Sequence, residues 1–347
     1  MSSRLVLGMN REMLAAGGQL PSHIVELPLR THPKVEFRVL EREVKVTTPD
    51  LLAGVDVCLA GSALWNAETF RGVEQLCCVA RWGVGYDNVD PKACTEADVA
   101  LMTTRGALDY SVAESALSFM LALSHRMLEK DRHVRNHDWS QRLTTLGSEL
   151  REKTIGIVGL GGIGLALLKL LNAFRPGKIL VFDPFLKPER AQELGVSIAS
   201  LNELLKASDI VTIHCPKTPE TTNLIDAAQL ALMKPTAYLV NTARGGIVNQ
   251  KALYEALREK KIRGAGIDVF EEEPCRKDEP LLTLDNVILS PHANSLTVEC
   301  FRDIGQFITD NVLKLMRGEP FEFVVNREVL TRPGFQKKVA ALTKRVS

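Results

Sequence analysis

Residues 154–174 read TIGIVGLGGIGLALLKLLNAF, a glycine-rich segment between two apolar runs. An apolar run at 155–158 predicts a strand, and the apolar residues from 165 to 174 predict a helix directly after three spaced glycines. Gly159 allows a tight turn, Gly161 lets the backbone approach a phosphate, and Gly164 lets the helix pack closely on the strand. The glycine spacing alone is a weak signal, but this strand, turn and helix together predict a dinucleotide-binding turn.

The next predicted strand, at 179–182, ends at Asp183, nineteen residues beyond Gly164. A carboxylate at this distance can accept hydrogen bonds from both hydroxyls of the adenosine ribose, and its charge repels a ribose phosphate. Because residues 184–186 contain no arginine to neutralise such a phosphate, we predict NAD rather than NADP as the cofactor. The alternative is an aspartate that only stabilises the turn before Pro184.

The length of the chain, 347 residues, favours two domains, because a single hydrophobic core usually stops growing below this length. Its 43 Lys and Arg balance 42 Asp and Glu, which gives no electrostatic footprint for nucleic acid or a membrane and favours a small-molecule partner. Seven cysteines without a CxxC pair argue against a disulfide framework and against a metal site. Since no leader-like start and no long apolar stretch occurs, we expect a cytoplasmic protein.

Short apolar runs alternate with helix-like segments in both halves of the chain, which predicts α/β domains with mostly parallel sheets. One series lies within residues 4–102, and a second, doubly wound series lies within 154–289. A predicted helix at about 297–316 could carry the chain back to the first domain. No function is predicted for the tail at 327–347.

Residues 111–128 read SVAESALSFMLALSHRML and predict one long helix that opens with a capping box between Ser111 and Glu114. The segment is apolar almost all round, so it is too hydrophobic for an exposed position. Two interpretations stay open, a helix inside the core of its own domain and a helix at the interface of a homodimer.

Polar side chains gather at four further strand ends, in residues 81–90, 241–246, 268–274 and 290–292. Arg244 offers a planar, permanently charged fork for a carboxylate or carbonyl. Histidine side chains commonly exchange protons in catalysis, so His292 could take up and return the proton of a hydroxyl, and Glu273 beside it would favour its charged form and orient its ring. Each residue alone reads as a surface or loop residue, but at consecutive strand ends after a dinucleotide turn the three predict an active site.

These segments resemble the D-isomer-specific 2-hydroxyacid dehydrogenases, whose patterns are RxGxGxDN, GxGxxG, HxP, ARGG, DVxxxEP and PH, over residues 81–326. The resemblance implies an NAD-dependent dehydrogenase with a Rossmann NAD-binding domain at 110–296, inserted into a flavodoxin-like substrate-binding domain at 1–109 and 297–347. It implies that Arg244 holds the substrate, His292 is the acid/base and Glu273 is its partner. His214, in the HxP motif, reads as structural.

The same resemblance implies which residues contact the two small molecules. Substrate contacts are expected at Arg81, Gly83, Gly85 and Arg244, with backbone amides around Gly83 to Gly85 binding the carboxylate. Cofactor contacts are expected at Val84, Gly159, Gly161, Gly162, Ile163, Gly164, Asp183, Cys215, Thr242, Ala243 and Asp268.

Within that family the chain is most similar to phosphoglycerate dehydrogenases and to their hydroxypyruvate, glyoxylate and glycerate relatives. The 21 residues after Asn326 are too few for the regulatory domain of the longer phosphoglycerate dehydrogenases. Three features depart from the pattern: Trp82 and Arg105 replace residues that are usually small or proline, and residues 293–295 replace a glycine-rich stretch. Trp82 could narrow the pocket or pack inward, and Arg105 could meet a phosphate or be solvated.

A different class of protein shares this fold, the non-catalytic, NAD-sensing co-repressors that resemble the family. Those proteins typically carry a tryptophan soon after the histidine, whereas residues 293–296 here are Ala, Asn, Ser and Leu. The sequence therefore favours a dehydrogenase over a scaffold.

Overall fold

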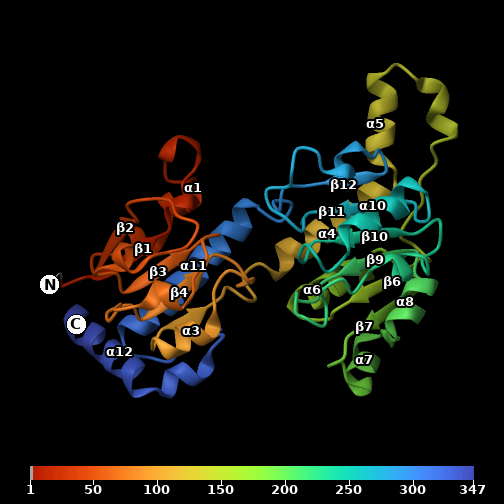
Figure 1. Cartoon of the computed structure of the whole chain (residues 1–347). Helices are drawn as coiled ribbons and strands as arrows, with labels where there is room; N and C mark the ends of the chain where they lie inside the picture. The colour runs from red at the N-terminus through yellow and green to blue at the C-terminus, as the bar shows by residue number, and fades with distance from the viewer. Residues whose placement is uncertain (1–2) are drawn as a thin grey trace. The chain divides into compact units, whose positions relative to one another are not determined.

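The computed structural model describes residues 3–347 and divides the chain into two compact units (Figure 1). Unit 1 comprises the residues up to Leu108 together with Thr297–Ser347, and unit 2 comprises Asp109–Leu296. The chain passes between the units at 108/109 and at 296/297, whereas the sequence suggested 109/110 and 296/297.

Among residues 3–108 and 297–347, five parallel strands form one sheet in the order β2-β1-β3-β4-β5. Alternate residues of β1 face opposite cores, with Leu5 and Leu7 on one side and Val6 on the other, so both faces of the sheet are covered. This strand order is the flavodoxin-like one. The strands are β1 (Leu5–Met9), β2 (Val35–Val39), β3 (Val57–Ala60), β4 (Cys78–Arg81) and β5 (Ala100–Met102).

The helices of unit 1 come from both ends of the chain. The predicted returning helix is confirmed as α11, and Thr297 caps it by accepting a hydrogen bond from the N–H of Cys300. The helices are α1 (Ser22–Val25), α2 (Pro28–Thr31), α3 (Pro91–Glu96), α11 (Val298–Met316) and α12 (Pro333–Val346).

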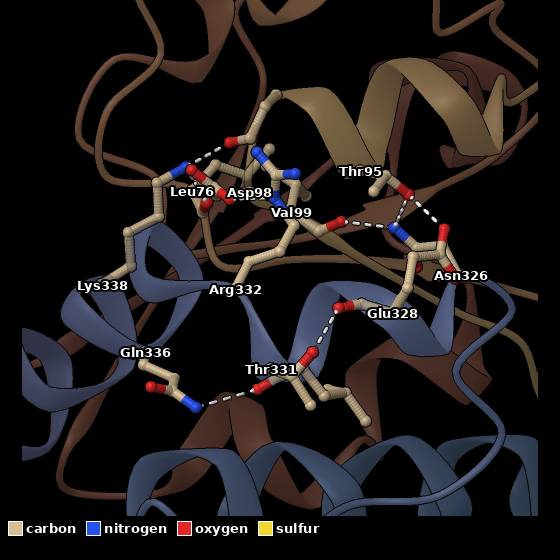
Figure 2. A network of polar contacts seen from close by, with 12 residues as sticks. Leu76, Thr95, Asp98, Val99, Asn326, Glu328, Thr331, Arg332, Gln336 and Lys338 are labelled. Atoms are coloured by element: carbon tan, nitrogen blue, oxygen red, sulfur yellow. Dashed lines mark hydrogen bonds and ion pairs between the residues drawn. The ribbon is translucent and has the colours of Figure 1, made fainter.

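The tail at 327–347, for which no function was predicted, packs against the first half of unit 1 (Figure 2). The side chain of Asn326 accepts a hydrogen bond from a main-chain N–H of β5, at 2.8 Å. Arg332 pairs with Asp98, and the ammonium group of Lys338 donates to two main-chain carbonyls at 2.8 and 3.1 Å. Near the end of α12, Arg345 pairs with Asp56, which is only 1% exposed.

Unit 2 contains seven parallel strands in the order β12-β11-β10-β9-β6-β7-β8. This is the doubly wound order of a Rossmann domain, with one further strand at the β12 edge. Because all the strands are parallel, their carboxyl ends lie along one edge of the sheet. The strands are β6 (Thr154–Val158), β7 (Lys178–Phe182), β8 (Ser197–Ile198), β9 (Ile210–Ile213), β10 (Tyr238–Asn241), β11 (Gly264–Ile267) and β12 (Val287–Leu289).

The apolar segment at 111–128 forms two helices rather than the single helix that we predicted. The first begins at Asp109, two residues before the proposed capping box of Ser111, and ends at Ser124. Arg126 then adopts a left-handed conformation, with φ of 54°, and separates the two helices. The helices of unit 2 are α4 (Asp109–Ser124), α5 (Met127–Arg135), α6 (Gly162–Asn172), α7 (Pro188–Leu194), α8 (Leu201–Ala207), α9 (Ala227–Leu230) and α10 (Gln250–Arg258).

Both faces of the unit 2 sheet are covered by helices. Side chains of α4 and α6 form one core with β6 and β10, and α8, α9 and α10 contribute to the core on the opposite face. Over residues 3–347, the structure contains no helix that is both long and apolar enough to cross a membrane.

Candidate functional site

Six strands of unit 2 each carry a predicted site residue just beyond their carboxyl ends, and these ends share one edge of the sheet. This edge therefore gathers residues that are up to 133 positions apart in the sequence. In strand order along the chain they are Gly159, Asp183, Cys215, Thr242, Asp268 and His292.

The glycine turn after β6 meets the requirements of a phosphate-binding turn. Gly159 has φ of +92°, and a Cβ there would lie 2.7 Å from the backbone nitrogen of Cys215. A Cβ on Gly164 would lie 2.6 Å from the carbonyl oxygen of Gly159, so the helix packs closely on the turn. A Cβ on Gly161 would meet no atom within 4 Å, which leaves space for a phosphate to approach the backbone. The three positions fit a dinucleotide.

Gly162 starts α6, and its neighbour there is a residue that the sequence patterns did not single out. A Cβ on Gly162 would overlap the carboxylate of Asp109, which begins α4. Position 162 therefore accepts only glycine while Asp109 stays in place. A single aspartate at the start of a helix carries no motif, so the sequence offered no signal for this contact.

Asp183 lies next to the glycine turn, as its position in the sequence suggested. Its Oδ2 accepts a hydrogen bond from the N–H of Leu160 at 2.7 Å, and its Oδ1 accepts one from the N–H of Phe185 at 2.8 Å. The second bond is the turn-stabilising contact that was the alternative interpretation. Because each carboxylate oxygen can accept more than one hydrogen bond, the carboxylate can also accept bonds from ribose hydroxyls.

The HxP segment after β9 lies against the glycine turn, because a Cβ on Gly159 would lie 2.9 Å from the carbonyl carbon of His214. The ring Nε2 of His214 lies 2.9 Å from the Thr212 hydroxyl, and burial lowers the pKa of His214 to about 4. The ring is therefore neutral at ordinary pH, which agrees with a structural role. Among residues 3–347, the hydroxyl of Thr242 is buried without a hydrogen-bond partner, as expected of a group reserved for a ligand.

Glu273 and His292 form a directly bonded pair. The ring Nδ1 of His292 lies 2.8 Å from Oε2 of Glu273, while Oε1 of Glu273 accepts a hydrogen bond from the N–H of Phe270 at 2.9 Å. Burial by itself would raise the pKa of Glu273, but the bonds from His292 and Phe270 and the charge of Arg244 hold it below its ordinary value. The side chains of His292 and Glu273 are 42% and 38% exposed. The pair therefore leaves Nε2 of an accessible histidine for proton exchange.

Arg244 follows β10 on a loop that other backbone groups hold tightly. Its Nη1 donates to the carbonyl of Ala243 at 2.7 Å, and the side chain of Asn241 donates to the carbonyl of Arg244 at 3.0 Å. A Cβ on the next residue, Gly245, would overlap the carbonyl oxygen of Phe270. The arginine loop and the loop that carries Glu273 are therefore in direct contact.

The turn that carries His292 is held by Asp268, a residue predicted to contact the cofactor. Asp268 is 2% exposed, and its Oδ1 accepts hydrogen bonds from the N–H groups of Ala293 at 3.0 Å and Asn294 at 3.1 Å. Its carbonyl accepts a bond from the N–H of His292 at 2.7 Å. Asp268 thus positions the histidine turn, a role that the sequence patterns did not suggest.

The predicted substrate loop lies in unit 1, directly after β4. Nε of Arg81 donates to the carbonyl of Gly85 at 2.9 Å, and its Nη1 donates to the carbonyls of Ala60, at 2.7 Å, and Gly61. The guanidinium group is therefore occupied in shaping the loop. Gly83 has φ of +145°, which favours glycine.

The two unusual residues of unit 1 differ in their surroundings. The ring of Trp82 packs against His23 and Phe301, with centroid distances of 5.4 and 6.5 Å. Trp82 therefore packs inward against α1 and α11. Arg105 is exposed.

Comparison with known proteins places this site among redox enzymes. Residues 117–294 match the family described as "D-isomer specific 2-hydroxyacid dehydrogenase, NAD binding domain". The chain is 41% identical to a glyoxylate reductase of Korarchaeum cryptofilum over 276 residues, which cover 78% of this chain and 83% of the relative. It is 40% identical to a glyoxylate reductase of Thermococcus onnurineus over 330 residues, which cover 92% of this chain and 97% of the relative.

Longer relatives and solved structures are similar as well. The chain is 43% identical to a D-3-phosphoglycerate dehydrogenase of Methanocaldococcus jannaschii over 260 residues, 75% of this chain and only 49% of the relative. The chain thus spans about half the length of that protein. Among solved structures, the NAD complex of a formate dehydrogenase from Staphylococcus aureus is similar, with a TM-score of 0.78 and 30% identity. The similarity covers 92% of this chain and 97% of the formate dehydrogenase.

Proposed function

Because this chain belongs to the D-isomer-specific 2-hydroxyacid dehydrogenases, we propose that its substrate is a small, unphosphorylated 2-hydroxy or 2-keto acid of the glycerate, hydroxypyruvate or glyoxylate type. The chain is an NAD-dependent oxidoreductase that acts on CH–OH groups. The bond between Glu273 and His292 is the observation that carries the proposed mechanism. When bound at the glycine turn, NADH would supply the hydride that reduces C2 of the 2-keto acid.

His292 acts as the proton donor in this direction. Its protonated Nε2 gives a proton to the carbonyl oxygen as C2 receives the hydride, and the ring is left neutral. In the oxidative direction the neutral ring takes the proton of the hydroxyl group. Glu273, held anionic by its bonds to His292 and Phe270, stabilises the charged ring and fixes its orientation. His292 thus donates the proton in reduction and accepts it in oxidation, and Glu273 stabilises the charged form of the ring in both directions.

Arg244 supplies the positive charge. Its planar guanidinium can hold the substrate carboxylate with two parallel hydrogen bonds and polarise the carbonyl oxygen. Its loop is fixed by Asn241 and by the close contact of Gly245 with Phe270, so the group keeps a defined position. Preorganised charge of this kind stabilises the oxyanion character that develops on the carbonyl oxygen.

The contacts of Arg81 support a substrate without a phosphate group. Its guanidinium group donates to three backbone carbonyls, so the cation of this loop is committed to shaping the loop. We propose that backbone amides around Gly83 to Gly85 also donate to the substrate carboxylate, in addition to Arg244. The two glyoxylate reductases also match this chain over most of their length, whereas the phosphoglycerate dehydrogenase matches over about half of its length.

A substrate comparison tests the proposal. Glyoxylate, hydroxypyruvate and 3-phosphohydroxypyruvate are supplied with NADH, and NADH consumption is followed by absorbance. We expect turnover with glyoxylate or hydroxypyruvate at a higher kcat/KM than with the phosphorylated acid. A preference for 3-phosphohydroxypyruvate would overturn the substrate assignment, and no turnover by a protein that binds NADH would indicate the scaffold class instead.

Replacing Glu273 with glutamine should shift the pH dependence of the reductive reaction. Glutamine keeps the shape of the side chain but removes the charge that stabilises the protonated ring of His292, so the reductive rate should begin to fall at a lower pH than in the wild type. Rates from pH 5 to 9 measure the shift. Glu272→Gln, at an exposed neighbouring position, is the matched control and should keep the wild-type profile. An unchanged profile for Glu273→Gln would remove Glu273 from the mechanism.

We also propose that the enzyme is a homodimer and that its partner surface lies beyond α4. Side chains of α4 are largely buried within unit 2, whereas α5 and the segment after it extend away from the sheet in Figure 1. Several large apolar side chains on this segment, which we call the arm (residues 127–146), are exposed by more than half. They are Met127, Val134, Trp139, Leu143 and Leu146. An apolar surface of this kind is typical of an interface between subunits.

Serine at both Trp139 and Leu143 should therefore convert the dimer into a monomer. Sedimentation velocity at micromolar concentration measures the mass, and Leu64→Ser, which alters an exposed leucine in unit 1, is the control. A wild-type protein that sediments as a monomer would contradict the proposal.

We propose the cytoplasm as the compartment. None of the seven cysteines, which all lie within the described residues, is in a disulfide, and five of them are buried. Free thiols persist where the compartment is reducing.

A further inference from the structure

We propose that Asn294 is a positioning residue for the reaction, because its side chain fastens the turn that carries His292 to helix α4. The inference rests on the proposed role of His292 as proton donor. It concerns three consecutive residues after β12, His292, Ala293 and Asn294, and two serines of α4. The sequence showed Asn294 only as part of a departure from a glycine-rich stretch.

The backbone of His292 is in an unfavourable conformation. Its φ of +55° lies in the left-handed region, which is unfavourable for a residue with a side chain. Such a conformation persists where the surrounding contacts determine it. The structure shows two sets of contacts that do so.

The first set comes from Asp268 and fixes the backbone of the turn. Its carbonyl accepts the N–H of His292 at 2.7 Å, and its Oδ1 accepts the N–H groups of the next two residues at 3.0 and 3.1 Å. All three bonds thus join the turn to Asp268, which directly follows β11. None of them joins the turn to helix α4.

The second set comes from the side chain of Asn294 and runs to α4. Its Nδ2 lies 3.1 Å from the carbonyl oxygen of Ser115, 2.7 Å from the Ser115 hydroxyl and 3.2 Å from the Ser118 hydroxyl. A carbonyl oxygen can only accept, so the amide nitrogen rather than the amide oxygen must face the helix. The Ser118 hydroxyl in turn donates to the Ser115 carbonyl at 2.7 Å.

The helix that receives these bonds is a rigid support. Ser115 is 4% exposed, and its neighbours Ala113, Ala116 and Phe119 are in the core that α4 shares with α6 and β10. The turn is thus held from the strand by Asp268 and from the helix by Asn294. Loss of the second anchor frees the His292 ring to leave Glu273, while the glycine turn and Asp183 are unaffected.

The expected result for Asn294→Ala is a loss of kcat of about tenfold or more, because small displacements of a reacting group are costly. The dissociation constant of NADH and KM for the keto acid should change less than threefold. Ser295→Ala, one residue along the chain, is the matched control and should keep wild-type kcat. A folded Asn294→Ala protein with kcat within twofold of the wild type would overturn the proposal.

A combination with His292 separates positioning from a general structural effect. In a His292→Ala background, Asn294→Ala should lower the residual rate no further, because the anchor acts only through the histidine. An equal fractional loss in both backgrounds would show that Asn294 acts elsewhere. If His292→Ala alone leaves turnover unchanged, the proposed mechanism fails. If His292→Ala abolishes turnover but Asn294→Ala leaves kcat unchanged, only the role of Asn294 is overturned.

A helix-side variant keeps the test available if Asn294→Ala does not fold. Replacing Ser115 and Ser118 together with alanine removes both hydroxyl partners but leaves the carbonyl partner and Asn294 itself. This variant should lose kcat several-fold with unchanged NADH affinity. Wild-type kcat in a folded protein of this kind would contradict the role of the anchor.

Discussion

Alanine at position 292 is expected to lower kcat for reduction of the keto acid by about 10² to 10⁴-fold, the usual loss when a general acid or base is removed. Glu273 then has no ring to orient, and no other group of the pair can deliver the proton. NADH binding should persist, because the glycine turn and Asp183 follow β6 and β7, whereas His292 follows β12 at an edge of the same sheet. Steady-state NADH consumption and a separate binding titration measure the two effects.

His125→Ala is the control for the loss of a histidine, since its side chain is exposed in unit 2. It should retain wild-type kcat. Unchanged turnover in His292→Ala would refute the acid–base assignment, and a parallel loss of NADH binding would show that the substitution had damaged the fold rather than the chemistry.

Lysine at position 244 should be nearly as harmful as a neutral residue, although the positive charge remains. The planar fork of Arg244 can form two parallel bonds to a carboxylate, whereas an ammonium group is a point charge on a flexible stem. We expect kcat/KM for the keto acid to fall by roughly 10²-fold, the loss typical of removing one preorganised donor.

Arg258→Lys offers a matched control, because Arg258 is an exposed arginine of α10 that pairs with Glu259. Its kcat/KM should equal that of the wild type. Near-normal efficiency in Arg244→Lys would show that charge alone suffices and would exclude the fork as the element that holds the substrate.

The nucleotide-binding half of the fold was predictable because its signals are local. Gly159, Gly161 and Gly164 each answer one steric demand of a turn between a strand and a helix, and the structure shows each demand at its own position. The catalytic candidates followed from the same logic, since polar residues at the carboxyl ends of parallel strands meet at one edge. His292 and Glu273 are 19 residues apart and yet directly bonded.

Other features have no local sequence pattern that predicts them, and some depend on contacts between distant residues. The capping box at Ser111 was wrong because α4 begins earlier, at Asp109, and the helix break at Arg126 has no glycine or proline to announce it. The anchor of Asn294 joins residues separated by 179 and 176 positions. The short strand β8 lacks a strong apolar pattern, since both of its residues are exposed.

The docking of the tail bears on the order in which the chain folds during synthesis. Unit 2 is continuous in sequence, so it can fold once residue 296 has emerged from the ribosome. Unit 1 must wait, because Asp56 on its early half is buried against Arg345 on its late half. Residues 3–108 are thus synthesised before unit 2 but complete their fold after it. During that interval their five-stranded sheet lacks α11 and α12, which help to cover one of its faces.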